Sequence, residues 1–91
     1  MNTISYVREP ERVAQYVQLL AKLYVQQPLH GALRIAAFRS AVDARNPFLE
    51  HGTFTNLLVT DGGNVLAHAS VVSDDRVPAA LVGFLDVATK Q

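Results

Sequence analysis

The stretch Asn46-Pro47-Phe48-Leu49-Glu50-His51 separates two parts of the chain that differ in hydrophobic periodicity. Before it, apolar residues recur every three or four positions, as on one face of an α-helix. After it they alternate with polar residues, as in a β-strand. Proline disfavours helical backbone in the residue before it, so Asn46-Pro47 is expected to end a helix. The sequence therefore predicts a hinge at residues 46–48, with the Phe48 ring buried against the helices.

Downstream of this hinge we expect a three-strand meander. Residues 54–60 and 65–73 show the two-residue period of strands, and Asp-Gly-Gly-Asn at residues 61–64 lies between them. Glycine supplies the positive φ angles that a tight hairpin turn needs. A polar loop at residues 74–79 then leads to a last strand at residues 80–87.

Upstream, residues 3–7 are expected to form a short first strand. A helix should begin at Glu9-Pro10-Glu11 and end at residues 25–27, because Pro28 cannot continue it. A second helix is expected from about residue 32 to about residue 44. The predicted fold class is α+β, a four-stranded antiparallel sheet with two helices between strands 1 and 2, in the order β-α-α-β-β-β.

Length, composition and charge narrow the classes of function. The chain has 91 residues, 49% of them hydrophobic, and a formal net charge of +0, which predicts one domain, residues 1–91, without affinity for nucleic acid or an acidic membrane. It has no cysteine, so neither a disulfide nor a thiol nucleophile is available. Apolar runs are far shorter than the ~20 residues of a membrane span, and no secretory signal is recognisable. We therefore expect a cytoplasmic protein.

The motif at residues 46–51 and the elements after it resemble the N-terminal half of the GCN5-related N-acetyltransferase (GNAT) family. One branch of that family carries a motif like Asn-Pro-Phe-Phe-Glu-His, followed by a strand, an Asp-Gly hairpin, a second strand and a Gly-Phe-containing strand. Here these are residues 46–51, 57–62, 65–74 and 82–85. The resemblance implies a GNAT-like N-terminal half-domain, in which the residue 46–51 motif has a structural role.

The same resemblance bears on acetyl-CoA. The family holds its pyrophosphate on a Gln/Arg-x-x-Gly-x-Gly/Ala loop after the fourth strand, whereas only Ala88-Thr89-Lys90-Gln91 follow that strand here. The single glycine pair, Gly62-Gly63, lies in a predicted hairpin with no helix after it. We therefore expect no cofactor, and acetyl-CoA binding only if a partner supplies a C-terminal GNAT half.

No arrangement of residues predicts a catalytic or metal site. His30, His51 and His68 have no metal-ligand spacing, and each is expected to be a surface or hydrogen-bonded histidine. Glu50 and His51 are adjacent, but the family motif there is structural. Aromatic residues of the two helices could line a cleft beside the second helix, where the family places its acceptor substrate: Tyr16, Tyr24 and Phe38.

The last predicted strand is apolar on both faces. Alternation places Val82 and Phe84 on one side and Leu81, Leu85 and Val87 on the other. This pattern is typical of a central strand covered on both faces, and without a cover it would be an exposed hydrophobic edge. The sequence therefore predicts a homodimer built on these five residues, by strand pairing or by strand exchange.

Three hypotheses of function follow. The first is a non-catalytic acetyltransferase-like half-domain that assembles as a homodimer. The second is a subunit or fragment of a GNAT acyltransferase that is completed in trans. The third is a small-ligand binding module that uses the cleft between the helices and the sheet.

Overall fold

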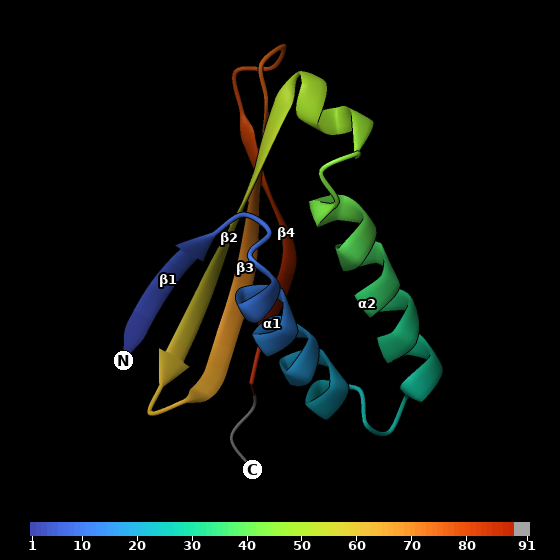
Figure 1. Ribbon diagram of the computed structural model, residues 1–91, viewed down its shortest axis with the longest axis vertical. Coiled ribbons are helices and arrows are strands. Elements are labelled where there is room, and N and C mark those ends of the chain that lie inside the picture. The colour runs from blue at the N-terminus through green and yellow to red at the C-terminus, as the bar shows by residue number, and fades with distance from the viewer. Residues whose placement is uncertain (89–91) are drawn as a thin grey trace.

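The computed structural model describes residues 1–88 and has two layers, a sheet and a pair of helices (Figure 1). The elements follow the predicted order: β1 (Asn2–Tyr6), α1 (Pro10–Leu23), α2 (Pro28–Val42), the short 3-10 helix η1 (Pro47–Glu50), β2 (Gly52–Asp61), β3 (Asn64–Asp74) and β4 (Ala80–Val87). The sheet order is β1-β2-β3-β4, and every neighbouring pair is antiparallel. The predicted α+β class and its β-α-α-β-β-β order are confirmed.

Both helices begin at a proline, which corrects the start of the second one. α2 starts at Pro28 and ends at Val42, whereas the sequence predicted residues 32–44. Proline suits the first helical position, because its missing N–H has no partner there and its fixed φ already matches the helix. Pro28 therefore starts α2, and α1 ends earlier than predicted, at Leu23.

The predicted hinge forms at η1. The Asn46 side chain accepts a hydrogen bond from the Phe48 N–H at 3.1 Å and donates one to the Ala41 carbonyl at 2.9 Å. It therefore ties the start of η1 to the last turn of α2. Gly52 begins β2 directly behind, and a Cβ atom at Gly52 would lie 2.3 Å from the Phe48 ring. Only glycine allows this close approach of ring and backbone.

Phe48 itself is not where the sequence placed it. Its ring is half-buried and lies at the η1 end of the sheet, around a small cavity shared with Val72, Val77 and Leu81. The 3-10 turn carries the ring past the end of α2, so the ring meets the sheet and the β3–β4 loop. The prediction that Phe48 packs against the helices is therefore wrong.

The core lies between the helices and one face of the sheet. Its fully buried members include Tyr16, Leu20, Phe38 and Leu58, each 0% exposed. On β2, alternate residues from Phe54 to Thr60 are buried, while the residues between them are half-buried. This alternation matches an antiparallel sheet with helices on one face and no layer of the described chain on the other.

Candidate functional site

β4 lies at the surface of the molecule, although most of its side chains are apolar. It is an edge strand of the sheet, and four of its apolar side chains are 59–71% exposed: Leu81, Val82, Leu85 and Val87. Among residues 1–88, no further strand pairs with its outer side. Soluble proteins seldom leave a long apolar edge strand unprotected. β4 is therefore the first candidate for a binding surface.

A β-bulge in β4 changes which way these side chains point. Gly83 lies opposite Ser70 and Asp86 opposite His68, so two residues of β4 face one residue of β3. Phe84 takes a φ of +45°, a conformation that is rare for a non-glycine residue. The extra residue shifts the alternation of side chains by one position in everything that follows it.

The bulge overturns the predicted grouping of the strand's residues. Phe84 turns toward the helices, where its ring lies 5.3 Å from that of Phe38 and 6.1 Å from that of Phe54. Leu85 and Val87 instead join Val82 on the sheet face opposite the helices. Strict alternation along the strand places Phe84 and Val82 on the same face. The sequence alone carries no sign of the inserted residue that separates them.

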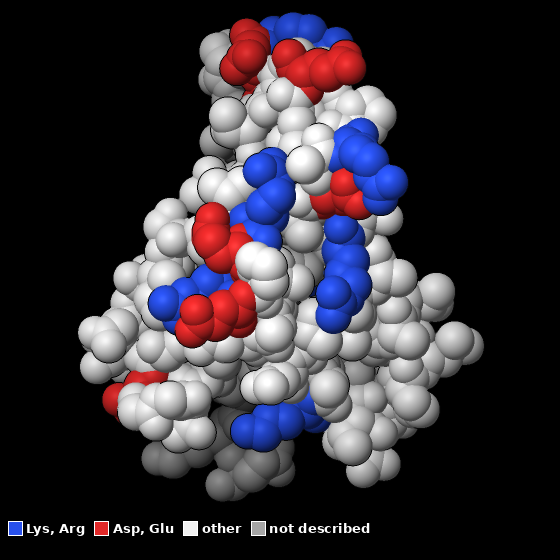
Figure 2. Space-filling model, viewed as in Figure 1, with Lys and Arg blue, Asp and Glu red and all other residues white. Residues whose placement is uncertain are grey.

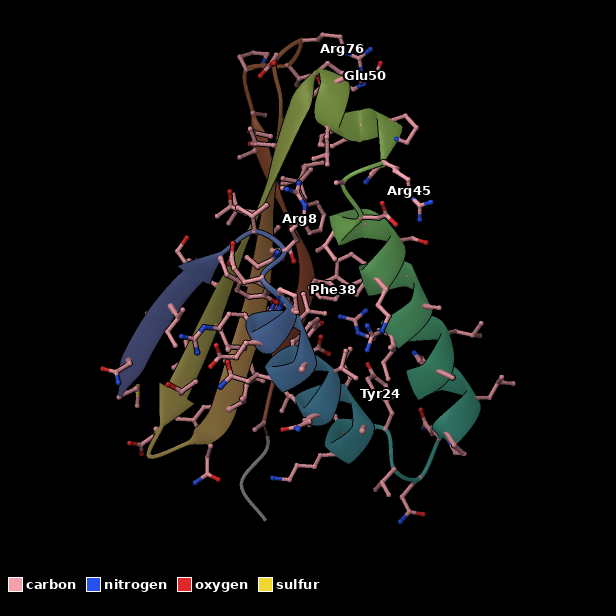
Figure 3. The ribbon with its side chains drawn as sticks, in the orientation of Figure 1. Arg8, Tyr24, Phe38, Arg45, Glu50 and Arg76 are labelled. Carbon is pink, nitrogen blue, oxygen red and sulfur yellow. The ribbon has the colours of Figure 1, made fainter. Side chains whose placement is uncertain are left out.

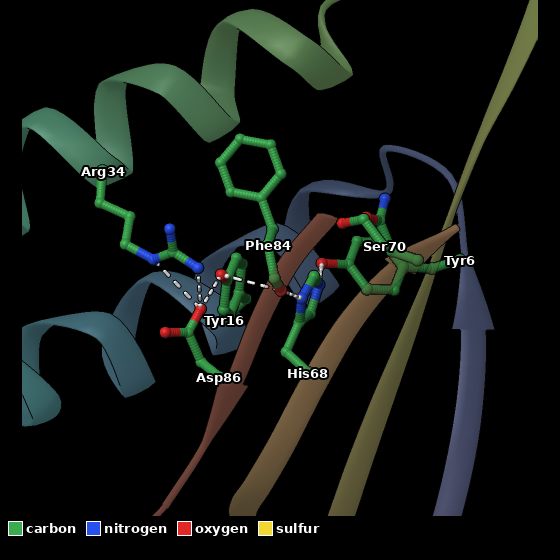
Figure 4. Close-up of polar contacts among 8 residues, drawn as sticks. Tyr6, Tyr16, Arg34, His68, Ser70, Phe84 and Asp86 are labelled. Carbon is green, nitrogen blue, oxygen red and sulfur yellow. Dashed lines mark hydrogen bonds and ion pairs between the residues drawn. The ribbon is translucent and has the colours of Figure 1, made fainter. Parts of the chain in front are cut away.

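Beneath the bulge, a hydrogen-bonded network fills part of the core (Figure 4). The His68 side chain is 1% exposed; its Nδ1 lies 3.1 Å from the Phe84 carbonyl oxygen and its Nε2 lies 2.7 Å from the Tyr6 hydroxyl. A carbonyl oxygen only accepts, so Nδ1 carries the proton and Nε2 accepts from Tyr6. Burial lowers the pKa of His68 to about 4, so the ring is neutral near pH 7.

A second branch of the network holds a buried ion pair. Asp86 is 8% exposed and accepts hydrogen bonds from the Tyr16 hydroxyl and from Arg34, whose Nη2 lies 2.8 Å away. The Tyr16 ring stacks on His68 at 3.5 Å, and its hydroxyl lies 3.3 Å from the Phe84 carbonyl oxygen. Burial, and then the hydrogen bond to Asp86, raise the pKa of Tyr16, which keeps it protonated.

This network fixes the bulge and leaves little for catalysis. The Phe84 carbonyl accepts a hydrogen bond from His68 and lies beside the Tyr16 hydroxyl, and the Asp86 carboxylate is paired with Arg34. A general acid or base must reach a substrate, yet Tyr16 and His68 are at most 1% exposed. The sequence suggested only that His68 could be hydrogen-bonded. Two features of the sequence could have indicated a buried polar network. His68 is set between two alanines, and Asp86 is the single charged residue in the last strand.

The residues predicted to line a cleft do not share one. Tyr16 and Phe38 are fully buried, with Phe38 pointing from α2 into the core (Figure 3). Tyr24 is half-buried and stacks on His30 at 4.8 Å, at the junction of the two helices. The helices pack closely enough on the sheet to bury the first two rings. An open groove lies elsewhere, between α2 and β4, and its lining includes Leu33, Arg34 and Phe84.

The neighbouring Glu50 and His51 do not form an acid/base pair. His51 Nδ1 lies 3.4 Å from the Asp74 carboxylate, and Arg76 binds the same carboxylate at 2.8 Å. The Arg76 hydrogen bonds hold the pKa of Asp74 well below its usual range. Glu50 and Arg76 lie at the same exposed end of the molecule (Figure 3). Among residues 1–88, no group of three His, Asp or Glu side chains could hold a metal ion.

Comparison with family models, curated proteins and solved structures gives no match to this chain. No helix among the described residues is long and apolar enough to cross a membrane. The surface of β4 and the geometry around it are therefore the features that bear on function.

Proposed function

We propose that this chain is a GNAT-like half-domain that is not catalytic by itself and acts by assembling into a homodimer through β4. The observation that carries the proposal is the 59–71% exposure of Leu81, Val82, Leu85 and Val87 on one edge strand. The β-α-α-β-β-β order supports the GNAT-like part, because the sequence resemblance implies that order.

Covering β4 would contribute a large stabilisation for a domain of this size. Full burial of one Val or Leu side chain contributes about 1.5–3 kcal/mol. Domains of fewer than 100 residues have a free energy of unfolding of only a few kcal/mol. Burial of several such side chains between two copies is therefore comparable to the stability of one copy alone.

The charge distribution also favours association. The formal net charge is +0, so two copies do not repel each other strongly. Charges of both signs are interspersed on the face that the helices cover (Figure 2). Asp86, the one charged residue of β4, points inward and is paired with Arg34.

We predict that Leu85→Lys converts the native dimer into a folded monomer. Leu85 is 61% exposed, so its replacement should leave the monomer core intact, while a lysine inside an apolar contact is left without a partner charge. Sedimentation equilibrium at micromolar concentration measures the change, with circular dichroism to check folding.

Leu29→Lys is the matched control for Leu85→Lys. Leu29 is 73% exposed and lies on α2, in the groove beside Phe84 and therefore on the other side of the sheet from Leu85, so this variant should remain a dimer. A native chain that is monomeric and soluble at the same concentration would contradict the proposed assembly. A dimer that survives Leu85→Lys would show that the contact does not bury the Leu85 side chain.

The described residues fit acetyl-CoA poorly, which supports a non-catalytic role. Phosphates bind at helix N-termini through free backbone N–H groups. α1 begins at Pro10 with Glu9 and Glu11 beside it, and α2 begins at Pro28. Proline removes one amide donor from each site, and the glutamates at α1 repel an anion.

We predict that isothermal titration calorimetry of the chain with acetyl-CoA shows no micromolar binding. Each missing hydrogen bond to a charged group removes about 1.5–3 kcal/mol, so the loss of several abolishes useful affinity. Micromolar binding to the chain alone would contradict this. Binding that appears only after addition of a second polypeptide would favour the alternative, an acyltransferase completed in trans.

The third hypothesis is a small-ligand module that uses a cleft between the helices and the sheet. The groove between α2 and β4 is lined by Leu33, Arg34 and Phe84, among others. Arg34 is already paired with Asp86, so the groove lacks a free charge from that residue to orient a ligand. We therefore rank it below assembly through β4.

A further inference from the structure

The sheet face opposite the helices, which we call the open face, is almost free of charge. The strand register places six apolar side chains on this face, from β2 to the β4 edge: Leu57, Ala69, Val71, Val82, Leu85 and Val87. The other residues of this face, between the Asp61 hairpin and the β3–β4 loop, are Thr, Ser, Ala or Val. An antiparallel sheet that faces water normally carries charged or strongly polar residues there.

The bulge completes this surface. Without it, Leu85 and Val87 would point toward the helices, and Asp86 would point to the open face. With it, Asp86 turns inward to Tyr16 and Arg34, and the two apolar residues turn outward. The strain of the Phe84 backbone, at a φ of +45°, therefore serves to remove a charge from the open face.

Edge pairing of β4 would leave these side chains uncovered. Strand pairing satisfies backbone groups along the edge, whereas side chains stand roughly perpendicular to the sheet. Val82, at 65% exposure, and Leu85, at 61%, need a layer packed against the face. The geometry of β4 therefore favours a layer packed against this face, a mode of assembly that the sequence did not suggest, over pairing along the edge.

We infer that a second copy of this chain packs its open face on this one, giving a helix–sheet–sheet–helix dimer. This inference rests on the proposed homodimer and specifies its contact. A twofold axis between the sheets and perpendicular to the strands places β4 on β4 and β3 on β3. Apolar residues then meet apolar residues, and the Thr and Ser side chains near β1 meet Thr and Ser side chains of the other copy.

The open face offers the minimum area that a specific contact between two copies needs. The strands have 5 to 11 residues, about eight on average; at roughly 3.3 Å per residue and about 4.8 Å between strands, the four of them cover about 500 Å² on each copy. The two copies together bury about 1,000 Å², which is at the lower limit for a biological interface. Sheets packed face to face in this way are common in β-sandwich proteins.

A second copy also suits the chemistry of this face better than a charged partner. In a twofold contact the same patch forms both sides of the interface, so an apolar patch without charge is complementary to itself. The open face has none between its two ends. A partner that used acidic or basic groups would find no complement there.

The test uses lysine substitutions at positions that an edge-paired dimer would not contact. Leu57 lies on β2, two strands from β4, and pairs with Ala69 on β3. Leu57→Lys and Ala69→Lys are each expected to raise the dimer dissociation constant at least about 100-fold, because each places two lysines in the dimer contact. Ala69→Lys removes no packed side chain, so it keeps the test valid if Leu57→Lys does not fold.

Sedimentation equilibrium compares these variants with the native chain and with Leu29→Lys, and circular dichroism checks folding. The face-to-face contact is supported if Leu57→Lys and Ala69→Lys are folded monomers while the native chain and Leu29→Lys are dimers. Dimers that survive both substitutions would overturn it and leave the proposed assembly through β4 in place. A monomeric native chain would overturn both the face-to-face contact and the proposed homodimer, and this holds even if a different protein covers the open face.

Discussion

Replacement of Phe38 by alanine is expected to unfold this domain at room temperature. Phe38 is fully buried, and its ring makes edge contacts with three other rings, at 4.6 Å to Tyr16 and at 5.3 Å to both His68 and Phe84. A Phe→Ala change in a core costs about 3–5 kcal/mol, because it removes buried surface and leaves a cavity. That is comparable to the whole free energy of unfolding of a small domain.

Urea unfolding followed by circular dichroism measures this effect. Leu33→Ala is the matched control, since Leu33 lies on the same helix and is 64% exposed. Its free energy of unfolding should change by at most about 0.5 kcal/mol, as for most surface positions. Phe38→Ala and Leu33→Ala variants of equal stability would show that Phe38 is not a core residue.

The second prediction is that the free energy of unfolding falls as the pH is lowered from 7.5 to 5. Burial lowers the pKa of His68 to about 4 in the folded protein, whereas an unfolded histidine has a pKa of about 6.5. Protonation would bury a charge in the core, and the Tyr6 hydroxyl, which donates to the neutral ring, would have to turn to accept from Nε2. Asp86 favours the protonated ring, but the cost of desolvation is larger.

The sign of the effect follows from proton binding. Above pH 6.5 neither state protonates His68, and its contribution is fully present. Below pH 6.5 the unfolded state binds a proton that the folded state does not, so stability falls by about 1.4 kcal/mol for each pH unit until the folded pKa is reached. At pH 5 the loss should be about 2 kcal/mol.

Urea midpoints measured at pH 7.5 and pH 5 test this prediction. Model carboxyl groups titrate near pH 4, so histidines dominate this interval. A His30→Gln/His51→Gln variant should keep the pH dependence, because neither ring lies in the core. A His68→Gln variant should lose it even if it is less stable at both pH values. A native protein equally stable at pH 5 and 7.5 would contradict the buried, neutral state of His68.

Local signals in the sequence predicted the order of elements. Asn46-Pro47 marked the break between the helices and the sheet, although α2 already ends at Val42, and the Asp-Gly-Gly-Asn turn placed the β2–β3 hairpin. These signals are reliable because each acts on the backbone of one or two residues. The start of α2 was missed by four residues, because Pro28 can end one helix and begin the next, and only the first role was considered.

The buried network could not be assembled from the sequence. Tyr6, Tyr16, Arg34, His68 and Asp86 come from five different elements, and only the packed chain brings them together. Tyr16 and Phe38 illustrate the same limit. Their helical spacing indicated an apolar face. Whether the two rings are buried or line a cleft depends on how closely the helices pack on the sheet, which the sequence does not show.

The sequence by itself determined the α+β order and the presence of an apolar strand at residues 80–87, since both depend on local periodicity. Tertiary structure alone decided which side of that strand each residue occupies. The bulge at Phe84 forms because His68 holds the Phe84 carbonyl while Tyr16 and Arg34 draw Asp86 inward, contacts made across 16 to 70 residues of sequence. One inserted residue reverses every later side chain, so a period read from the sequence cannot reveal it.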